Sequence, residues 1–329
     1  MTESPEGLTH RLAPDLEKVE AGLREATSYA EAAIAGPAGH LAEAGGKRLR
    51  PMLTLLTSHL GSGVNESVRA AAVSVELTHL ATLYHDDVMD SALVRRGAPA
   101  AQALWGNNVA ILTGDLLFAK ASQIVAGLGP EAVLMHAETF ERLCLGQLHE
   151  TIGPAEGVDA IQHYLDVLAD KTGSLIATSA RYGAMFGGAP EHLVGVMEAF
   201  GEKVGLAFQL ADDVIDLTSD GDVTGKTPGT DLREGVDTMP VLLLRKHERE
   251  GTLDEEGREI LALLASDLEG DSELAAAVGR LRTHAVVDET RVMARQWADD
   301  AIAELRGLPE GEVRTVLEEF ALQLVDRLA

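Results

Sequence analysis

The sequence predicts an all-α protein, and three observations lead to this prediction. Apolar residues recur every three or four positions along most of the 329 residues, which is the repeat of an α-helix. Hydrophobic residues make up 46% of the chain but aromatic residues only 4%, while Ala, Leu and Glu, which lose little side-chain freedom in helices, are abundant. No segment shows the regular alternation of apolar and polar residues that a half-buried strand would have.

Turn-forming residues mark breaks between the expected helices. They are GSGVN at 61–65, GPAEG at 153–157, GGAP at 187–190 and LPEGE at 308–312. The expected helices span 14–35, 65–90, 107–127, 130–152, 160–186, 191–217, 236–247, 256–265, 271–282, 285–306 and 310–328. No linker rich in Pro, Gly or Ser interrupts the series, so residues 1–329 are expected to form a single domain. About the first ten residues are expected to be flexible.

The longest segment without a helical pattern is TSDGDVTGKTPGTDLREG at 218–235. Loops of this length in compact domains are usually lids, binding loops or disordered segments. This segment contains Lys226 and directly follows an acidic cluster, so we expect a role in binding rather than a simple surface excursion.

Charge and composition exclude several classes of function. The formal net charge of −26 argues against a nucleic-acid partner, because phosphate backbones require a basic surface. The single cysteine, Cys144, excludes an internal disulfide framework and suits a reducing compartment. No apolar run approaches the ~18 residues of a membrane span, and the acidic N-terminus lacks the apolar core of a secretory signal. We therefore expect a soluble, cytoplasmic protein without an integral membrane segment.

Two acidic clusters of the form DDxxD end two strongly apolar helical segments. The first consists of Asp86, Asp87 and Asp90, and the second of Asp212, Asp213 and Asp216. In each cluster the first and last Asp share one helical face, with the middle Asp beside them. One acidic stripe at a solvated helix end is common, but two of the same form are not expected by chance. Carboxylate oxygens on such faces suit Mg²⁺, which takes one or two carboxylates with waters and substrate phosphates. Two half-sites facing each other across a helix bundle would hold a diphosphate.

The few basic residues gather at two places, GGKRLRP at 45–51 and RRG at 95–97. Arg matches phosphate with a planar fork and Lys provides a compact charge. The Gly45–Gly46 pair allows the backbone to approach a ligand closely, and Pro51 suits the first turn of a following helix. A lone KRLR is most often a surface patch. The RRG, however, lies only five residues beyond the first acidic cluster and would share its site.

These stretches together resemble the family of trans-isoprenyl diphosphate synthases, with the pattern of long-chain polyprenyl synthases. The matching stretches are GGKRLRP, ELTHLATLYHDDVMDSALVRRG, NNVAILTGDLLFAKAS, Gly146–Gln147, Lys171–Thr172–Gly173, FQLADDVID, Gly225–Lys226 and LVDRLA. They cover nearly the whole chain in the family's order. The resemblance implies a helical bundle around a deep central cavity, the isoprenoid synthase fold, in a homodimer.

The resemblance also implies a reaction and its residues. Isopentenyl diphosphate would be joined head-to-tail to an allylic diphosphate, with Mg²⁺ as cofactor at three ions in each active site. The metal ligands would be Asp86, Asp90, Asp212 and Asp216, and the expected catalytic residues are Asp86, Asp90, Lys171 and Asp212. The allylic diphosphate would contact Arg95, Lys171, Thr172, Gln209 and Lys226. Isopentenyl diphosphate would contact Lys47, Arg50, His79 and Arg96.

Several positions allow more than one interpretation. A lone His in an apolar helix is more often a core residue than a ligand, but His79 lies two turns before Asp86, which permits contact with the cavity. Glu76 and His79 also form an E-x-x-H, the motif of di-iron bundles, yet such bundles need two and the chain has no second. Many relatives place a Lys where this chain has Val236, so one diphosphate contact is missing or is supplied by another basic residue such as Arg233. His85 and Cys144 are expected to be structural.

Two other classes of protein use a similar bundle. Terpene cyclases usually replace the second aspartate cluster with an Asn/Ser/Glu metal motif and lack a second diphosphate site. Non-catalytic subunits of heteromeric synthases should have lost metal ligands. The second DDxxD and the GGKRLRP box are both intact here, so prenyl elongation is favoured over both alternatives.

Product length is expected to depend on the helix preceding Asp86. Relatives that stop early often carry bulky aromatic residues about one turn below the first aspartate. Here these positions are Ala81 and Thr82, and Val75, about three turns below, is also modest in size. We therefore expect a long-chain polyprenyl product of the kind used for quinone side chains, with possible membrane contact for its release. A farnesyl or geranylgeranyl product is the alternative.

Overall fold

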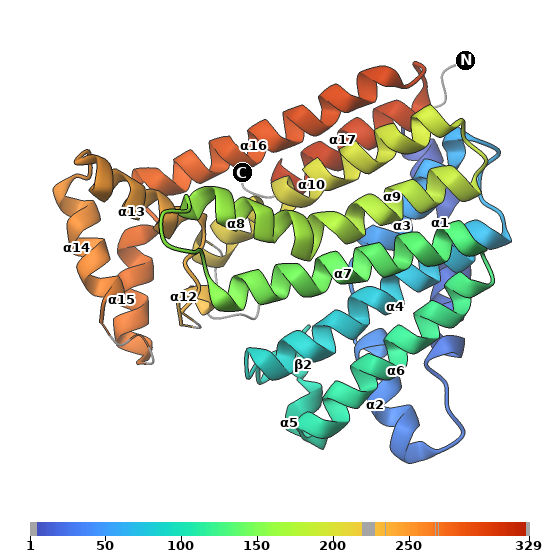
Figure 1. Cartoon of the computed structure of the whole chain (residues 1–329), viewed down its shortest axis with the longest axis horizontal. Helices are drawn as coiled ribbons and strands as arrows, with labels where there is room; N and C mark the ends of the chain where they lie inside the picture. The colour runs from blue at the N-terminus through green and yellow to red at the C-terminus, as the bar shows by residue number, and fades with distance from the viewer. Residues whose placement is uncertain (1–4, 219–227, 234, 267, 269, 327–329) are drawn as a thin grey trace. The chain divides into compact units, whose positions relative to one another are not determined.

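The computed structural model describes residues 5–218, 228–233, 235–266, 268 and 270–326. Nearly all of its regular structure is helical (Figure 1), which confirms the predicted all-α fold class. Contacts divide the chain into two compact units. Unit 1 comprises Met1–Leu143, Ser174–Glu202 and Glu304–Glu318, and unit 2 comprises Cys144–Gly173, Lys203–Ala303 and Glu319–Ala329. The single domain expected from the sequence stays a prediction.

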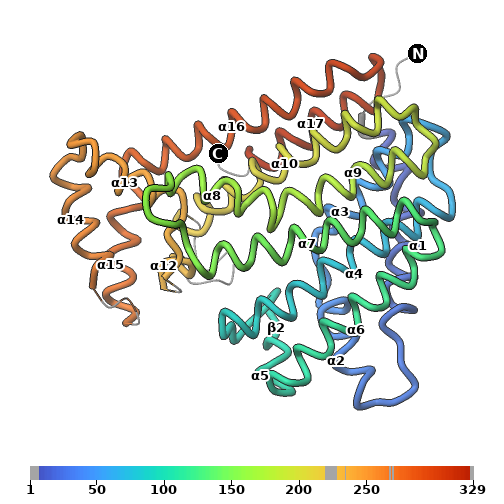
Figure 2. The backbone as a smooth tube through the Cα atoms, viewed as in Figure 1, coloured from blue at the N-terminus to red at the C-terminus, as the bar shows by residue number. Residues whose placement is uncertain are grey.

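Helix α4 (Glu66–Met89) is the central helix of unit 1. It begins where the Asn65 side chain accepts a hydrogen bond from the Val68 amide at 3.0 Å, a typical N-cap. All side chains from Ala71 to Thr78 are buried, because neighbours cover the helix on several sides. Those neighbours are α1 (Pro5–Ala26), α3 (Leu49–Thr57), α6 (Asn107–Ala126) and α9 (Ser174–Phe186). The path of α4 along α6 can be followed in Figure 2.

The remaining elements of unit 1 are short or shared with unit 2. They are α2 (Ala32–Glu43), the 3₁₀ turn Ser58–Leu60, α5 (Ala101–Trp105), the first part of α7 (Pro130–Ile152), the first part of α10 (Glu191–Thr218), the 3₁₀ turn Leu305–Gly307 and the start of α17 (Glu312–Asp326). Helices α4 and α6 run antiparallel, since His85 lies against Ile111 and Val75 packs with Val125.

Unit 2 is built on the second half of α10. Its other elements are α8 (Ala160–Leu168), the π-helical turn η2 (Ala169–Gly173), α12 (Thr230–Arg233), α13 (Met239–Glu250), α14 (Glu255–Leu264), α15 (Asp271–Leu281) and α16 (Ala285–Glu304). The side chains of Leu210, Val214 and Leu217 are buried in one core with residues of α13 to α16.

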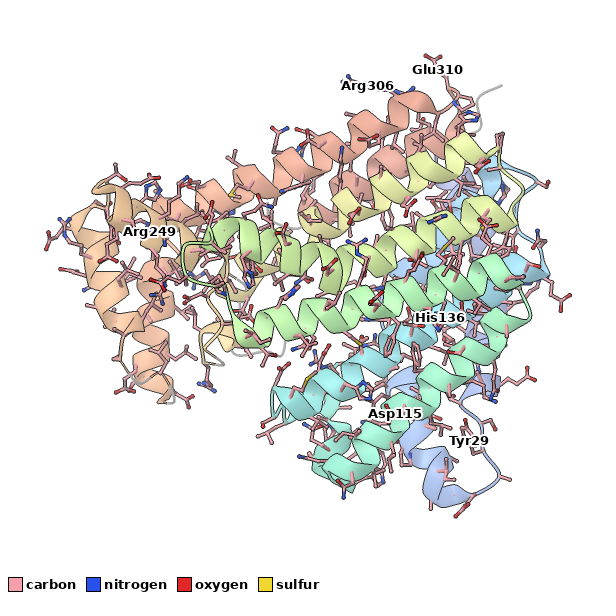
Figure 3. The ribbon with its side chains drawn as sticks, viewed as in Figure 1. Tyr29, Asp115, His136, Arg249, Arg306 and Glu310 are labelled. Carbon is pink, nitrogen blue, oxygen red and sulfur yellow. The ribbon has the colours of Figure 1, made fainter. Side chains whose placement is uncertain are left out.

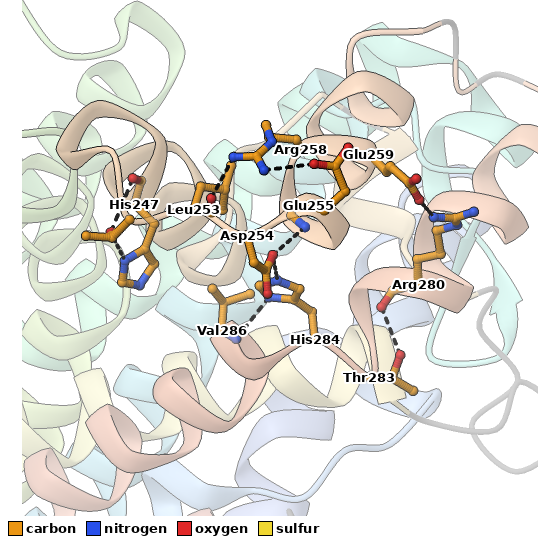
Figure 4. A network of polar contacts seen from close by, with 12 residues as sticks. His247, Leu253, Asp254, Glu255, Arg258, Glu259, Arg280, Thr283, His284 and Val286 are labelled. Carbon is orange, nitrogen blue, oxygen red and sulfur yellow. Dashed lines mark hydrogen bonds and ion pairs between the residues drawn. The ribbon is translucent and has the colours of Figure 1, made fainter.

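A polar network fixes the start of α14 within unit 2 (Figure 4). The Asp254 side chain accepts a hydrogen bond from the Gly257 amide at 2.7 Å and contacts His284 Nε2 at 3.2 Å. The other ring nitrogen of His284 accepts from the Val286 amide at 3.3 Å, in the first turn of α16. One histidine thus joins the first turns of two helices, each of which has amide groups without intrahelical partners.

The structure differs from the expected helices in several places. Two helices, α1 and α2, replace the single helix expected at 14–35. The helical pattern stops after Thr27, whose amide still donates to the Leu23 carbonyl, because the Ser28 amide donates to the Glu25 carbonyl only three residues back. Helices α3 and α5 were not in the expected series, although Pro51 does lie in the first turn of α3. The turn η2 divides the helix expected at 160–186 into α8 and α9.

A short hairpin follows α4. Strand β1 (Val94–Arg95) pairs antiparallel with β2 (Ala98–Pro99), with Val94 opposite Pro99 and Arg95 opposite Ala98. Strands of two residues are too short to show an alternating pattern, so this hairpin could not be predicted.

The N-terminal segment and helix α6 bear on two further expectations from the sequence. Helix α1 begins at Pro5, within the segment expected to be flexible, whose flexibility stays a prediction. Contrary to the sequence expectation, one described helix, α6, is long and apolar enough to cross a membrane, and 33% of its apolar window is buried.

Candidate active site

The first acidic motif lies at the C-terminal end of α4, in unit 1. Asp86 is partly buried and Asp90, the C-cap residue, is exposed. Asp87 is fully buried and faces inward, where Arg95 of β1 holds its Oδ1 atom through Nε and a terminal nitrogen, both at 2.6 Å. Burial raises the pKa of Asp87, and the charge and hydrogen bond of Arg95 oppose that shift. The middle aspartate therefore anchors the hairpin, while Asp86 and Asp90 share the outer face.

The GGKRLRP segment is fixed by Arg48. This residue lies in the left-handed region, with φ of 50°, directly before α3. Its buried guanidinium contacts Glu76 at 2.9 Å and Glu20 at 2.5 Å and donates to the Ala42 carbonyl at 2.8 Å. A buried charge so fully paired has a structural role, and breaking such a pair costs about 3–5 kcal/mol. Arg48 therefore positions Lys47 and Arg50, its neighbours in the segment.

Arg96 covers the glycine pair of the same segment. Its φ is 53°, and its guanidinium donates to the Leu41 carbonyl at 3.1 Å and also to the Gly45 carbonyl. A Cβ atom on Gly46 would lie 2.9 Å from Arg96 Cζ. The glycine is needed there because any side chain would push the guanidinium away.

Arg50 and His79 lie in the same group of positive charges. Burial lowers the pKa of Arg50 to about 10, and Arg96 contributes to the shift. The buried Nε atom of Arg50 has no hydrogen-bond partner among the described residues. The pKa of His79 lies well below its usual value, first because the ring is buried and then because Arg50, Arg96 and Arg95 repel its positive form. His79 is therefore neutral at neutral pH.

The second acidic motif lies near the end of α10, in unit 2. Asp213 is 4% exposed, and both of its oxygens accept from the Tyr164 hydroxyl, at 3.0 and 2.9 Å. Its Oδ2 atom also accepts from the Met239 amide at 3.1 Å. Burial raises the pKa of Asp213 well above its usual range, against the effect of these hydrogen bonds. Asp212 and Asp216, partly buried, share a different face of α10.

Lys171 lies in the π-helical turn of unit 2, and its Nζ atom contacts Glu150 Oε2 at 2.5 Å. Gly146 permits this arrangement, because a Cβ atom there would lie 2.7 Å from the Lys171 amide nitrogen. Thr172 is buried beside Lys171, and Gln209 is partly buried on α10. Single π turns within helices frequently occur at functional sites.

The predicted site residues thus fall into two groups. Unit 1 holds Lys47, Arg50, His79, Asp86, Asp90, Arg95 and Arg96, and unit 2 holds Lys171, Thr172, Gln209, Asp212 and Asp216. Lys226 lies outside the described residues. Arg233, considered as a substitute for the Lys missing at Val236, contacts Asp271 at 2.5 Å. The predicted chain-length positions Val75 and Ala81 are buried, and Thr82 is partly buried.

Three partners of the site residues were not identified from the sequence. Tyr164 holds Asp213, Glu150 holds Lys171, and Glu76 holds Arg48. Glu76 stood out only as half of an E-x-x-H motif. Tyr164 precedes Lys171 by seven residues, or two helical turns. That spacing could have indicated that Tyr164 faces the same side as the predicted site residue Lys171.

The carboxylates can be compared with what a divalent metal needs. Among the described residues, no three His, Cys, Asp or Glu side chains gather closely enough to hold a metal by themselves. Each acidic motif instead offers two carboxylates on one face. Two carboxylates completed by water and phosphate oxygens are a typical Mg²⁺ set, so the residues fit this ion when a phosphorylated substrate is present.

Comparison with known proteins agrees with this geometry. The family model for polyprenyl synthetase matches residues 31–279. The nonaprenyl diphosphate synthase of Mycobacterium tuberculosis is 46% identical over 292 residues, which is 88% of this chain and 85% of that protein.

Solved structures give the same result. A geranylgeranyl pyrophosphate synthase from Corynebacterium glutamicum, complexed with calcium and isoprenyl diphosphate, has a TM-score of 0.85 and 40% identity and covers 100% of this chain and 99% of its own. A decaprenyl diphosphate synthase from Rhodobacter capsulatus has a TM-score of 0.86 and 34% identity, and covers 99% of both chains. The resemblance seen in the sequence is confirmed, as are the isoprenoid synthase fold and the enzyme class. The chain belongs to the polyprenyl synthetase family.

Proposed function

We propose that the protein condenses isopentenyl diphosphate with an allylic diphosphate to build an all-trans polyprenyl diphosphate, with Mg²⁺ as cofactor. The observation that carries this proposal is the group of like charges around His79 in unit 1. Arg50, Arg95 and Arg96 gather there in a protein of net charge −26, and one buried guanidinium nitrogen of Arg50 has no partner among the described residues. Asp87 already pairs with Arg95, and a diphosphate would supply charge and acceptor oxygens to the donors of Arg50 and Arg96 that remain.

The residues divide the work between two diphosphates. Lys47, Arg50 and Arg96, with neutral His79, would bind isopentenyl diphosphate. Lys171 and the outer carboxylates of both motifs would serve the allylic diphosphate, with Thr172 and Gln209 as further contacts. Arg95 would contribute its remaining donors, since Asp87 already occupies one edge of its guanidinium. Lys226 belongs to the proposed set on the resemblance alone.

Asp86 and Asp90, and separately Asp212 and Asp216, would hold the Mg²⁺ ions, three in each active site. Bound Mg²⁺ would stabilise the negative charge that develops as the diphosphate leaves the allylic carbon. Lys171, kept in place by Glu150, would bind an oxygen of the departing diphosphate. Apolar side chains such as those of Ala81 and Leu80 would keep water from the carbocation.

We propose a long-chain product. Val75 and Ala81 are buried and small or modest in size, and the Thr82 hydroxyl is bonded to the His79 carbonyl at 2.8 Å. None of these α4 residues could stop a growing chain by its bulk. The nonaprenyl and decaprenyl synthases among the similar proteins support this choice.

A shorter product is the second candidate, favoured by an aromatic stack on α6 and α7. Measured between ring centroids, Phe118 lies 3.7 Å from Phe140 and 5.0 Å from His136. Figure 3 labels His136 on α7. The antiparallel register of α4 and α6 places Phe118 at about the level of Thr82. An aromatic group at this level, contributed by a different helix, would limit the product as a bulky α4 residue does in other members of the family.

We further propose that the enzyme is a cytoplasmic homodimer formed through α6 and α7. Val109, Ile111 and Leu112 of α6 are exposed, Leu112 to 65%, as are Val133 and Leu134 of α7. Large apolar side chains exposed along neighbouring helices support an interface. A second copy accounts for the apolar character of α6 without a membrane span, and membrane contact would be limited to release of the product.

The test is incubation of the full chain with Mg²⁺, labelled isopentenyl diphosphate and allylic primers of several lengths. We expect label in a polyprenyl diphosphate longer than geranylgeranyl, and none after chelation with EDTA. Absence of any condensation with every primer would refute the function, whereas a geranylgeranyl product would refute only the product length. A double-mutant cycle compares the loss of turnover in Asp86→Ala, in Asp212→Ala and in the double variant. If both motifs act on the same diphosphate, the two losses will be strongly non-additive.

A further inference from the structure

The middle aspartate of the second motif connects three helices of unit 2. Asp213 lies on α10, its two oxygens accept from Tyr164 on α8, and Oδ2 also accepts from the amide of Met239, the first residue of α13. The carboxylate is 4% exposed and packed among apolar side chains that include Leu210, Val214 and Met239. A polar group buried in such surroundings is costly without hydrogen bonds, so the carboxylate stays in contact with its partners.

Asp213 supplies a cap that α13 lacks in its own sequence. Thr238 is the N-cap residue of α13, and its side chain makes no capping hydrogen bond. The first amides of a helix have no intrahelical partner, and a carboxylate near them is stabilising. Asp213 provides this acceptor from another helix, so the start of α13 and the end of α10 depend on the same side chain.

The described segment between α10 and α13 is tied to the second motif at both of its ends. The Gly229 amide donates to the Asp216 carbonyl at 3.0 Å. At the other end, the Met239 amide donates to the Asp213 carboxylate. The described residues 229–233 and 235–239, including α12, are therefore placed by the last two turns of α10.

The bond at Asp213 also sets which way its neighbours face. Successive residues of a helix are about 100° apart, so Asp212 and Asp216 share a face that lies beside the direction of Asp213. If Asp213 points to α8, the orientation of the other two carboxylates is determined. Loss of the Tyr164 hydroxyl would leave that orientation to the single bond from Met239.

We propose that Tyr164 is a positioning residue for the second acidic motif: through its hydrogen bonds to Asp213 it orients Asp212 and Asp216 for metal and diphosphate binding. This inference rests on the proposed function, because it assigns those two carboxylates to the metal. Tyr164 itself would touch neither metal nor substrate.

The chain offers a matched control in Tyr182. Its side chain is fully buried and its hydroxyl donates to the Ala132 carbonyl at 2.8 Å, within unit 1. Tyr164→Phe and Tyr182→Phe each remove one buried hydroxyl from a tyrosine. Only the first removes a contact with an acidic motif.

The experiment measures the binding of Mg²⁺ with inorganic diphosphate by calorimetry, together with the Michaelis constants of both substrates. For Tyr164→Phe we expect binding weakened about tenfold, the lower end of the loss seen when a residue that orients metal ligands is removed. The Michaelis constant of the allylic substrate should rise by a similar factor and that of isopentenyl diphosphate should not change. Tyr182→Phe should leave all three values within about twofold.

Substitution of Asp213 separates anchoring from metal ligation. Asp213→Asn keeps an oxygen that accepts from Tyr164 and Met239 without the charge, so metal binding should stay within about threefold of the unmodified protein. Asp213→Ala should weaken it at least as much as Tyr164→Phe. Equal loss in the Asn and Ala variants would identify Asp213 as a ligand and overturn the inference, as would equal values for Tyr164→Phe and Tyr182→Phe. If the unmodified protein binds Mg²⁺ with diphosphate but transfers no prenyl group, the proposed function fails while the calorimetric test of Tyr164 still holds.

Discussion

Gly46→Ala should weaken the binding of isopentenyl diphosphate through Arg96. The new Cβ atom would lie 2.9 Å from Cζ and 3.0 Å from each terminal nitrogen of the guanidinium. Real Cβ atoms essentially never come closer than 3.0 Å to another heavy atom, so the guanidinium, the end of a flexible side chain, would have to move. Arg96 would leave its place against the Leu41 and Gly45 carbonyls. A lost charge-assisted hydrogen bond to the substrate corresponds to about 1.5–3 kcal/mol, or about a 10- to 150-fold rise in the Michaelis constant.

Gly45→Ala is the matched control for this change. Gly45 has φ of 81° and Gly46 has φ of 148°, so alanine is unfavourable at both positions and each variant should lose about 1–2 kcal/mol of stability. Apart from its chain neighbours, no atom of the described residues lies within 4 Å of a Cβ atom at Gly45, so the new side chain would not displace Arg96.

The assay is steady-state condensation with isopentenyl diphosphate varied at saturating allylic substrate, and the reverse. Gly46→Ala should raise the Michaelis constant of isopentenyl diphosphate alone, and Gly45→Ala should lower only the unfolding temperature. The reasoning would be refuted if the two variants had the same Michaelis constants, or if Gly46→Ala affected the allylic substrate equally.

Four further predictions follow from the site. Asp86→Ala should lower kcat/KM about a thousandfold with an unchanged helical circular dichroism spectrum; near-normal turnover at limiting Mg²⁺ would contradict it. Arg96→Ala should chiefly raise the Michaelis constant of isopentenyl diphosphate and Lys171→Ala that of the allylic substrate, about tenfold or more each, so equal effects would mean inseparable subsites. Ala81→Phe should shorten the product, measured by chromatography, without abolishing the first condensation; an unchanged length would place the limit elsewhere. The lowered pKa of His79 means that the unfolded chain binds its proton first, so stability is full above about pH 6.5 and falls as pH drops toward the folded pKa. His79→Gln should reduce that acid-induced loss in denaturant titrations, and an identical pH profile would exclude the effect.

The sequence predicted long helices well because their apolar spacing is repeated over many turns. The start of α4 follows the turn at 61–65, and α6 and α7 match their expected ranges closely. The failures lie where a single local interaction decides the structure. The end of α1 at Ala26 depends on hydrogen bonds around Thr27, and α3 begins after a left-handed Arg48 that two distant glutamates hold. No periodicity within the sequence indicates either.

The sequence predicted which side chains belong to the candidate site. It did not predict which other residues those side chains contact. A pattern such as DDxxD or KTG shows which side chains are available, since spacing along a helix determines the shared face. It does not show that Lys171 meets Glu150, or that Arg95 is already bonded to Asp87. Those contacts join segments that are separate in the chain, so they depend on tertiary packing.

The two acidic motifs have the same letters and are anchored by different means. In the first, the middle aspartate is held by a guanidinium from the following hairpin, and in the second by a tyrosine hydroxyl and a helix amide. Each solution buries one carboxylate and leaves the other two on a shared face. A buried carboxylate needs partners wherever it is, so the middle position requires some anchor but not a particular one. The middle carboxylate of each motif is therefore occupied by contacts within the protein, and its partner, Arg95 or Tyr164, lies outside the motif.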